Sequence, residues 1–174
     1  ANTHMLAVDG LVHRPLALRV AELEARYSRT QAIVTMQCAG NRRDELAAVR
    51  PIPGEVPWGA EAVGTAWWSG FRLADVLADA GVAPGAAYVA FEGLDRITRD
   101  GSTFGFGASI ALERALAGDV LLADRLADGP LPPEHGHPLR LVVPGFVGAR
   151  SVKWLGRVTV QAEPSNNHFQ ARAY

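Results

Sequence analysis

The chain of 174 residues contains one cysteine, Cys38, and one lysine, Lys153. A single cysteine excludes an intramolecular disulfide, so packing alone must stabilise the fold. It also excludes a C-x-x-C-H haem site and an iron–sulfur cluster held by cysteines of this chain. The other basic residues are all arginines. The planar guanidinium groups suit oxyanions. A bias in genomic base composition would produce the same excess of arginine over lysine, and it is the preferred explanation.

The sequence also lacks a strong net charge and a long apolar run. The net charge of −1 and the pI of about 6.6 give no broad electrostatic surface for nucleic acid or membrane. No apolar run approaches eighteen residues, so no membrane span is predicted. The first residues of the sequence contain no basic or apolar signal-peptide region. Removal of a signal peptide would leave the same sequence, so both compartments remain consistent with it.

Apolar residues make up 48% of the chain, enough for one substantial core, and a single domain over residues 1–174 is predicted. Short strands and helices follow one another without a regular β-α-β order, which predicts an α+β class with a mixed sheet. The expected strands cover residues 5–10, 31–38, 87–91, 120–123, 139–143 and 157–161, with another around Leu131. The expected helices cover residues 16–27, 44–49, 61–68 (weakly), 73–80 before Gly81, and 109–116 with Ser109 as the cap. Residues 96–102 are expected to form a surface loop.

The most informative segment is T-M-Q-C-A-G-N-R-R, residues 35–43. An apolar run that stops at C-A-G-N predicts a buried strand leading into a tight loop, with the Cys38 thiol at the sheet edge. Arg42 and Arg43 would favour the thiolate, and a soft thiolate suits a soft or high-valent transition metal. The plainer alternative is that Cys38 is a small buried hydrophobe without chemistry.

C-A-G-N-R-R resembles the signature of the sulfite oxidase family of molybdenum enzymes. The similarity extends to four further stretches: W-W-S-G-F-R-L-A-D-V-L (67–77), F-E-G-L-D (91–95), F-G-A-S-I (106–110) and P-L-P-P-E-H-G-H-P-L-R-L-V-V-P-G-F-V-G-A-R-S-V-K-W-L-G-R-V (130–158). The closing H-F-Q-A-R-A-Y (168–174) matches as well. In order and spacing, the resemblance covers nearly the whole chain and implies a mixed-sheet, molybdopterin-binding α+β domain.

By this resemblance, Cys38 is the protein ligand to molybdenum, and a pyranopterin dithiolene with oxo or water oxygens supplies the remaining ligands. The resemblance further implies which residues hold the pterin and its phosphate: Asp95, His135, Arg140, Ser151, Val152 and Lys153. A buried phosphate needs several charge-assisted donors, which these side chains can provide. The alternatives are that His135 only caps a turn and that Arg140 and Lys153 are solvated. Apolar neighbours argue for local burial of Lys153.

The resemblance also assigns the substrate pocket. Arg43 matches the arginine that faces the substrate oxyanion, and its guanidinium fork suits sulfite. Trp58 matches a tryptophan that lines the pocket, although Glu61 replaces glycine in its W-x-x-G pattern; ordinary packing is the alternative. Tyr174 matches an active-site tyrosine, and fraying is its alternative because it is the last residue.

Two departures from the family pattern are expected to matter. The chain begins after the F-x-R-N-H segment that completes the anion site, and it ends before the immunoglobulin-like dimerisation domain. It is therefore expected to be part of a longer enzyme, a homodimer when whole, and this form need not hold cofactor.

The resemblance implies oxidation of sulfite to sulfate by oxygen-atom transfer at a cysteine-ligated molybdenum, with a c-type cytochrome as electron acceptor. Bacterial relatives favour an extracytoplasmic location. The alternatives are a nitrate- or sulfoxide-reducing enzyme on the same fold, a non-catalytic molybdopterin-binding fragment, and an unrelated domain with a buried cysteine.

Overall fold

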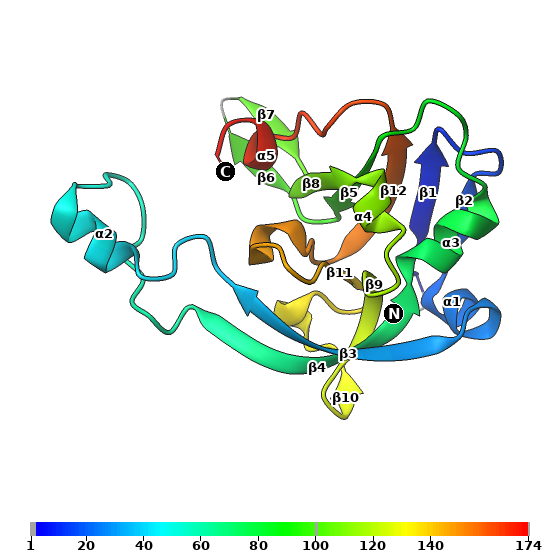
Figure 1. Ribbon diagram of the computed structural model, residues 1–174, viewed down its shortest axis with the longest axis horizontal. Helices are drawn as coiled ribbons and strands as arrows, with labels where there is room; N and C mark the ends of the chain where they lie inside the picture. The colour runs from blue at the N-terminus through cyan, green and yellow to red at the C-terminus, as the bar shows by residue number, and fades with distance from the viewer. Residues whose placement is uncertain (1–2, 100, 174) are drawn as a thin grey trace.

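The computed structural model describes residues 3–99 and 101–173, so Tyr174 lies outside the described residues. Two five-stranded sheets, a two-stranded hairpin and several short helices make up the fold (Figure 1). This confirms the predicted α+β class with mixed sheets. The helices are α1 (Val20–Arg26), α2 (Arg43–Val49), α3 (Leu73–Ala80), α4 (Leu112–Ala115) and α5 (His168–Ala171), with the 3₁₀ turns η1 (Pro133–His135) and η2 (Gly148–Arg150).

The first sheet has the strand order β2-β1-β12-β5-β8. Its strands are β1 (Leu6–Gly10), β2 (Leu16–Leu18), β5 (Tyr88–Gly93), β8 (Gly107–Ala111) and β12 (Leu155–Gln161). The strand pair β1–β12 is parallel, and the other pairs are antiparallel. Alternate residues of these strands point into the main core, among them Val8, Val158 and Val160. Residues far apart in the sequence thus share the centre of this sheet.

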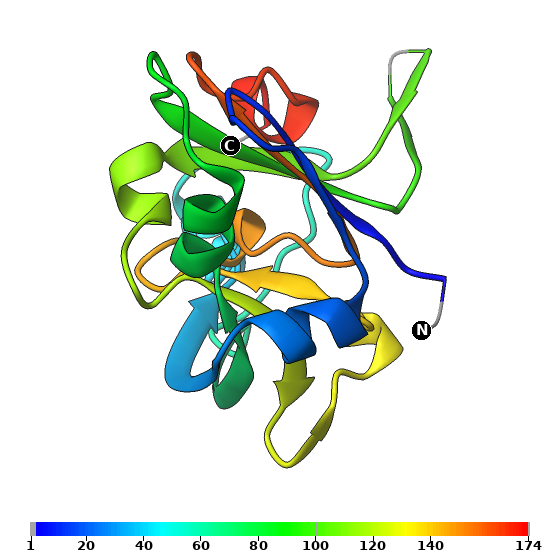
Figure 2. The same cartoon turned by 90° about the vertical axis from the view of Figure 1, so that its right-hand side faces the viewer.

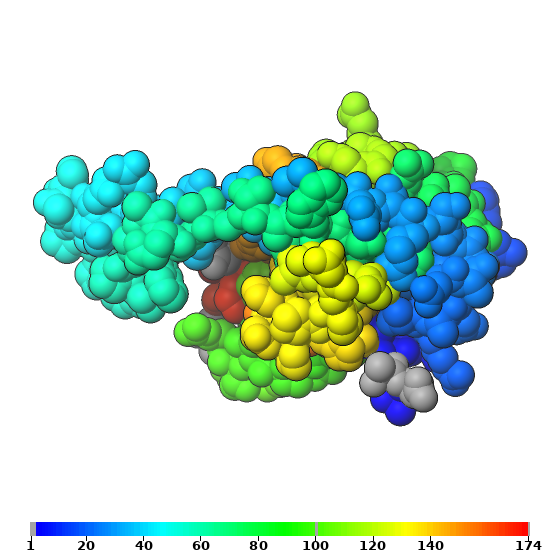
Figure 3. All heavy atoms as spheres, turned by 90° about the horizontal axis from the view of Figure 1, so that it is seen from below, coloured from blue at the N-terminus to red at the C-terminus, as the bar shows by residue number. Residues whose placement is uncertain are grey.

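The second sheet has the order β10-β9-β4-β3, with β11 paired to β9. Its strands are β3 (Arg29–Gln37), β4 (Val63–Arg72), β9 (Leu121–Leu126), β10 (Gly129–Pro130) and β11 (Arg140–Val142). The pair β3–β4 runs in register from Arg29 opposite Phe71 to Gln37 opposite Val63. Past this pairing, residues 38–62 leave the body as an arm that carries α2 (Figures 1 and 3).

Helix α3 packs into the core between the two sheets (Figure 2). Its residues Leu73, Val76, Leu77 and Ala80 are fully buried at helical spacing. Gly81 ends the helix with φ of 70°, a backbone conformation that glycine adopts without the penalty of a Cβ atom. The predicted helix 73–80 and its glycine stop are confirmed.

Four local predictions from the sequence are wrong. Residues 61–68 were expected to be weakly helical, but β4 begins at Val63, because pairing with β3 and β9 outweighs local propensity. Ser109 lies in β8 and caps no helix: its backbone N–H donates to the side chain of Gln170 at 2.6 Å. The predicted helix 16–27 is divided between β2 and α1, and the predicted loop 96–102 contains parts of the hairpin β6 (Ile97–Arg99) and β7 (Ser102–Phe104).

The strand predicted over residues 31–38 is present as β3, but it is not a buried strand. Val34 is its buried residue, whereas Ile33 is 59% exposed. The strand lies at the edge of the second sheet, where it pairs with β4 alone. Its alternate side chains face solvent. An apolar run alone does not distinguish an edge strand from a central one.

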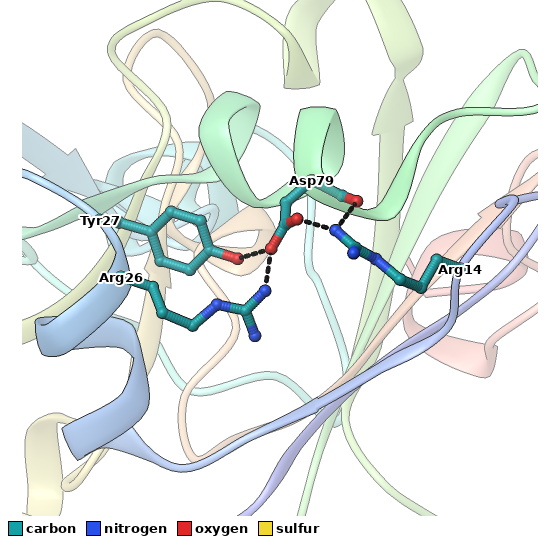
Figure 4. A network of polar contacts seen from close by, with 4 residues as sticks. All are labelled: Arg14, Arg26, Tyr27 and Asp79. Atoms are coloured by element: carbon teal, nitrogen blue, oxygen red, sulfur yellow. Dashed lines mark hydrogen bonds and ion pairs between the residues drawn. The ribbon is translucent and has the colours of Figure 1, made fainter.

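Asp79, on α3, gathers three donors from other parts of the chain (Figure 4). Arg14 and Arg26 form ion pairs with its carboxylate, and the Tyr27 hydroxyl donates to Oδ2 at 2.7 Å. We call these four residues the Asp79 cluster. The hydrogen bond from Tyr27, followed by the two arginines, lowers the pKa of Asp79. Burial and the bond to Asp79 raise the pKa of Tyr27 to about 12. The cluster fastens α1 and the β1–β2 connection to α3.

Candidate cofactor and anion site

Cys38 directly follows β3 at the base of the arm, and its side chain is exposed. Its backbone N–H donates to the carbonyl of Ala62 at 2.9 Å, which joins the two limbs of the arm at this point. The Asn41 side chain adds a second link, because its oxygen accepts from the Ala62 N–H at 3.0 Å. The N–H of Gly40 donates to Sγ at 3.4 Å. The thiol is therefore held in a fixed turn and remains accessible to a ligand.

A cavity of about 870 Å³ opens beside this thiol, bounded by the arm, β4 and η1. Met36 and Trp68 contribute to its apolar wall. The cavity brings together five residues that the sequence singled out: Cys38, Trp58, His135, Arg140 and Lys153. A thiol, an imidazole and two cations on one cavity suit a large anionic ligand with a soft metal.

Arg140 is the most buried cation of this cavity, with 6% of its surface exposed. Its guanidinium donates to the backbone carbonyls of His135 at 3.0 Å and Ser151 at 2.9 Å, and it lies 4.8 Å from the ring centroid of Trp68. Burial lowers the pKa of Arg140 to about 10, so the group stays charged at neutral pH. Among the described residues it forms no ion pair, which leaves its charge available to an anion.

Lys153 is the second cation, and its Nζ donates to the carbonyl of Glu134 at 2.9 Å. The ammonium also lies 4.3 Å from the centroid of the Trp154 ring. Burial, and then the charge of Arg140, lower the pKa of Lys153. The lowered pKa shows that the charges of Arg140 and Lys153 repel each other, and a bound anion would relieve that repulsion.

A second cavity of about 190 Å³ adjoins the first, because Arg140 and Lys153 line both. It also contains Asp95 and Ser151. The carboxylate of Asp95 accepts from the backbone N–H of Phe106 at 3.1 Å. The buried hydroxyl of Ser151 accepts from the N–H of Val143 at 3.0 Å and keeps its own proton to donate. Five of the six predicted pterin residues thus line one or both of these neighbouring cavities, and Val152 lines neither.

Two more predicted residues are placed by backbone contacts. His135 ends η1, where its N–H donates to Pro132 and its carbonyl accepts from Arg140. It therefore closes a turn, and it also lines the larger cavity. Val152 is buried and its carbonyl accepts from Leu141 at 2.8 Å, which ties the 151–153 segment to β11.

The predicted substrate residues lie on the arm. Trp58 is 47% exposed and lines the larger cavity. Arg43, in contrast, turns into the arm: its Nη1 lies 2.9 Å from Oε2 of Glu55 and donates to the carbonyl of Val56. Arg42 pairs with Glu45 on the outside of α2. The two adjacent arginines thus point different ways.

Sequence reasoning missed one residue beside Arg140 and one partly buried arginine. Trp68 was not singled out in the sequence, yet its ring lies against the Arg140 guanidinium. Recognition of β4 as a strand would have placed Trp68 on the face opposite Trp67. Arg150, in η2, has a buried Nη1 without a hydrogen-bond partner among the described residues. No sequence signal distinguishes it from the other arginines.

Within residues 3–99 and 101–173, no three side chains of His, Cys, Asp or Glu are grouped so that they could hold a metal ion. In the same part of the chain, no helix is long and apolar enough to cross a membrane. A metal bound at Cys38 would accordingly take its other ligands from a cofactor or from solvent.

Comparison with known proteins gives consistent matches. Residues 1–169 match the family model of the oxidoreductase molybdopterin-binding domain. Sulfite oxidase of Gallus gallus is 46% identical over 178 residues, which cover 99% of this chain and 38% of that protein. The NADPH nitrate reductase of Fusarium oxysporum is 39% identical over 164 residues, 93% of this chain and 18% of that protein. The crystal structure of the sulfane dehydrogenase SoxCD from Paracoccus pantotrophus matches with a TM-score of 0.80 at 29% identity, over 95% of this chain and 40% of that chain. This chain spans well under half the length of each.

Proposed function

Since this chain belongs to the sulfite oxidase family of molybdopterin-binding domains, we propose that it is the cofactor-binding part of a molybdenum oxidoreductase that oxidises sulfite to sulfate. One observation carries the proposal. An exposed thiol and two cations that form no ion pair with the described residues share a single cavity.

The donor set fits a phosphorylated pyranopterin dithiolene that carries molybdenum. The Cys38 thiolate is the soft protein ligand that such a metal takes. Arg140 and Lys153, which form no ion pair with the described residues, would hold the phosphate, with help from the Ser151 hydroxyl and the backbone of Val152. Asp95 would accept from N–H groups of the pterin, and His135 would close the cradle at the mouth of the larger cavity.

When bound, the cofactor would supply oxygen-atom transfer to the sulfur of sulfite. The overall reaction would consume one water and release two protons and two electrons, for which we propose a c-type cytochrome as the external acceptor. Arg43 would neutralise the substrate oxyanion, Trp58 would form a wall of the substrate pocket, and Tyr174 would hydrogen-bond near the reacting oxygen.

The similarity to a nitrate reductase supports a second candidate. The same site would then reduce nitrate, an oxyanion that an arginine fork can also bind. The same fold and donor set would also suit an enzyme that reduces sulfoxides, or a domain that binds the cofactor without catalysis. For the whole protein we propose a homodimer and, by analogy with bacterial relatives, an extracytoplasmic location.

The first test is the molybdenum and pterin content of the protein expressed in a host that makes the cofactor, compared with Cys38→Ser. We expect near-stoichiometric molybdenum in the native protein and a loss of at least tenfold in the variant, because an alcohol replaces the soft ligand. Sulfite-dependent reduction of cytochrome c, with nitrate reduction assayed in parallel, then selects the substrate. A native protein without molybdenum, or a Cys38→Ser variant with unchanged sulfite oxidation, would reject the proposal.

A further inference from the structure

The guanidinium of Arg43, to which the proposed function assigns the substrate oxyanion, already holds an internal anion. Its Nη1 lies 2.9 Å from the carboxylate of Glu55 and 2.9 Å from the carbonyl of Val56. The Arg43 side chain is 17% exposed, whereas that of Glu55 is 56% exposed. A carboxylate on the solvent side thus covers a cation that is otherwise largely enclosed.

This pair sits against the turn that carries the thiol. A Cβ atom at Gly40 would come within 2.8 Å of the Arg43 guanidinium, so the guanidinium packs directly over the Gly40 backbone. The N–H of that same Gly40 donates to Sγ of Cys38. However, Arg43 does not line the cavity of about 870 Å³ beside the thiol, because its fork is directed to the arm. An anion at the thiol can gain the full fork only if the contact with Glu55 is given up.

We propose that Glu55 is a positioning residue that competes with the substrate oxyanion for Arg43 and thereby sets the anion affinity of the site. This inference rests on the proposed function, which gives Arg43 its substrate. A carboxylate offers the fork two oxygens, as sulfite and sulfate do, so the two anions replace one another without a change in the kind of bond. The same carboxylate repels an approaching anion while it is in place.

The chain supplies a matched control on the same arm. Arg42 donates to Glu45 through two bonds of 2.8 Å each, and both side chains of this pair are largely exposed. The arm therefore has two arginine–glutamate pairs of the same chemistry. One packs over the thiol turn, and the other lies on the outer side of α2. Only the first should affect anion binding at the site.

The test measures sulfate binding to the chain by isothermal titration calorimetry at fixed ionic strength, since sulfate is the unreactive product. We expect Glu55→Gln to lower the Kd for sulfate about two- to fivefold. This is the change in affinity that corresponds to the free energy of an exposed ion pair. Glu45→Gln should leave the Kd unchanged. Glu55→Asp, which keeps the charge, should restore a wild-type Kd, whereas a merely structural role for Glu55 would not predict tighter binding in any variant. In an Arg43→Gln background, the gain from Glu55→Gln should disappear.

Equal sulfate affinities in the wild type and Glu55→Gln, or no measurable binding by either, would overturn the inference. An equal gain from Glu45→Gln would also overturn it, because the effect would then be one of net charge. Molybdenum content, measured on the same proteins, separates this failure from failure of the proposed function. Full molybdenum loading with unchanged sulfate affinities rejects the role of Glu55 alone. Absent molybdenum with a gain specific to Glu55→Gln rejects the proposed function and leaves the competition intact.

Discussion

Two regions of this molecule collect positive charge and treat it in opposite ways. In the Asp79 cluster, one carboxylate takes two guanidinium groups and a phenol (Figure 4). At the candidate site, Arg140 and Lys153 donate to backbone carbonyls, and neither is in an ion pair with any described residue. In the first region the cations pair with a carboxylate of the chain, whereas in the second region no described carboxylate forms an ion pair with them.

The difference separates a stabilising cluster from a binding site. A satisfied cluster lowers the free energy of the folded chain directly. A buried cation without a counter-charge raises it, and the low pKa of Arg140, about 10, reflects that cost. A chain that keeps such a group gains from it only when an anion binds. The candidate site around Arg140 and Lys153 is therefore the region that we associate with a ligand.

The largest effect should come from removal of the positive charge of Arg140. Arg140→Met keeps an unbranched side chain, and we expect it to weaken retention of the molybdenum cofactor about 10- to 100-fold. The reason is that a hydrogen bond to a charged group contributes about 1.5–3 kcal/mol. The Tm of the cofactor-free chain should shift by less than about 3 °C, since the lost carbonyl bonds are offset by relief of the buried charge. Cofactor content after gel filtration, together with thermal unfolding, measures both quantities.

Arg125→Met is the control for this variant, because Arg125 donates to the carbonyl of Asp128 in the β9–β10 turn and lines neither cavity. Wild-type cofactor retention by Arg140→Met would show that the Arg140 charge does not hold the cofactor. The proposed functional difference between the two regions would then be rejected.

A smaller and opposite effect is expected at the Asp79 cluster. Asp79→Asn should lower the free energy of unfolding by about 1–2 kcal/mol, because two ion pairs and a hydrogen bond lose their charged acceptor. This corresponds to a fall in Tm of about 2–6 °C. Cofactor retention should not change. Asp128→Asn, at an exposed position, should have the wild-type Tm. Loss of cofactor in Asp79→Asn would mean that the two regions are not independent.

The smallest effects are those of pH. The pKa of Asp79 is lowered in the folded chain, so its contribution to stability is complete above its ordinary pKa of 3.8 and is lost as pH falls through the lower folded value. The pKa of Tyr27 is raised to about 12, so its contribution is complete below its ordinary pKa of 10.0 and is lost as pH rises towards 12. The Tm difference between wild type and Asp79→Asn should therefore shrink below about pH 4. The smaller difference between wild type and Tyr27→Phe should shrink above about pH 10. Differences that stay constant across these windows would show that neither group is coupled to folding.

Sequence reasoning placed the elements whose signals are local. Helix α3 has four buried apolar residues at helical spacing and a glycine stop, so its pattern needs no distant partner. The short strands β5 and β11 carry apolar runs, β12 alternates apolar and polar residues over 157–161, and all three were also predicted. The failures depend on distant contacts. Ser109 is held in β8 by Gln170, 61 residues further along, and β4 is extended because two other strands pair with it.

The candidate site shows the same division. The resemblance selected the residues, and five of them share a cavity, but their protein partners were not predictable. Nothing in R-R indicates that Arg42 faces outward to Glu45 while Arg43 turns in to Glu55, because that depends on the left-handed backbone of Arg42, with φ of 63°. Likewise, contact between Trp68 and Arg140 depends on the pairing of β4 with β9 and of β9 with β11.

The parallel pairing of β1 with β12 has a consequence for the order in which the protein is made. Asp9 and Thr159, which are bonded across this pair, stand 150 residues apart, so the pair cannot form until β12 has left the ribosome. Contacts this distant in sequence form slowly, because the intervening loop must close first. The segment 140–153, which carries Arg140 and Lys153, directly precedes β12 and leaves the ribosome just before it. Both cations of the cofactor cradle therefore become available only shortly before the β1–β12 pair can close.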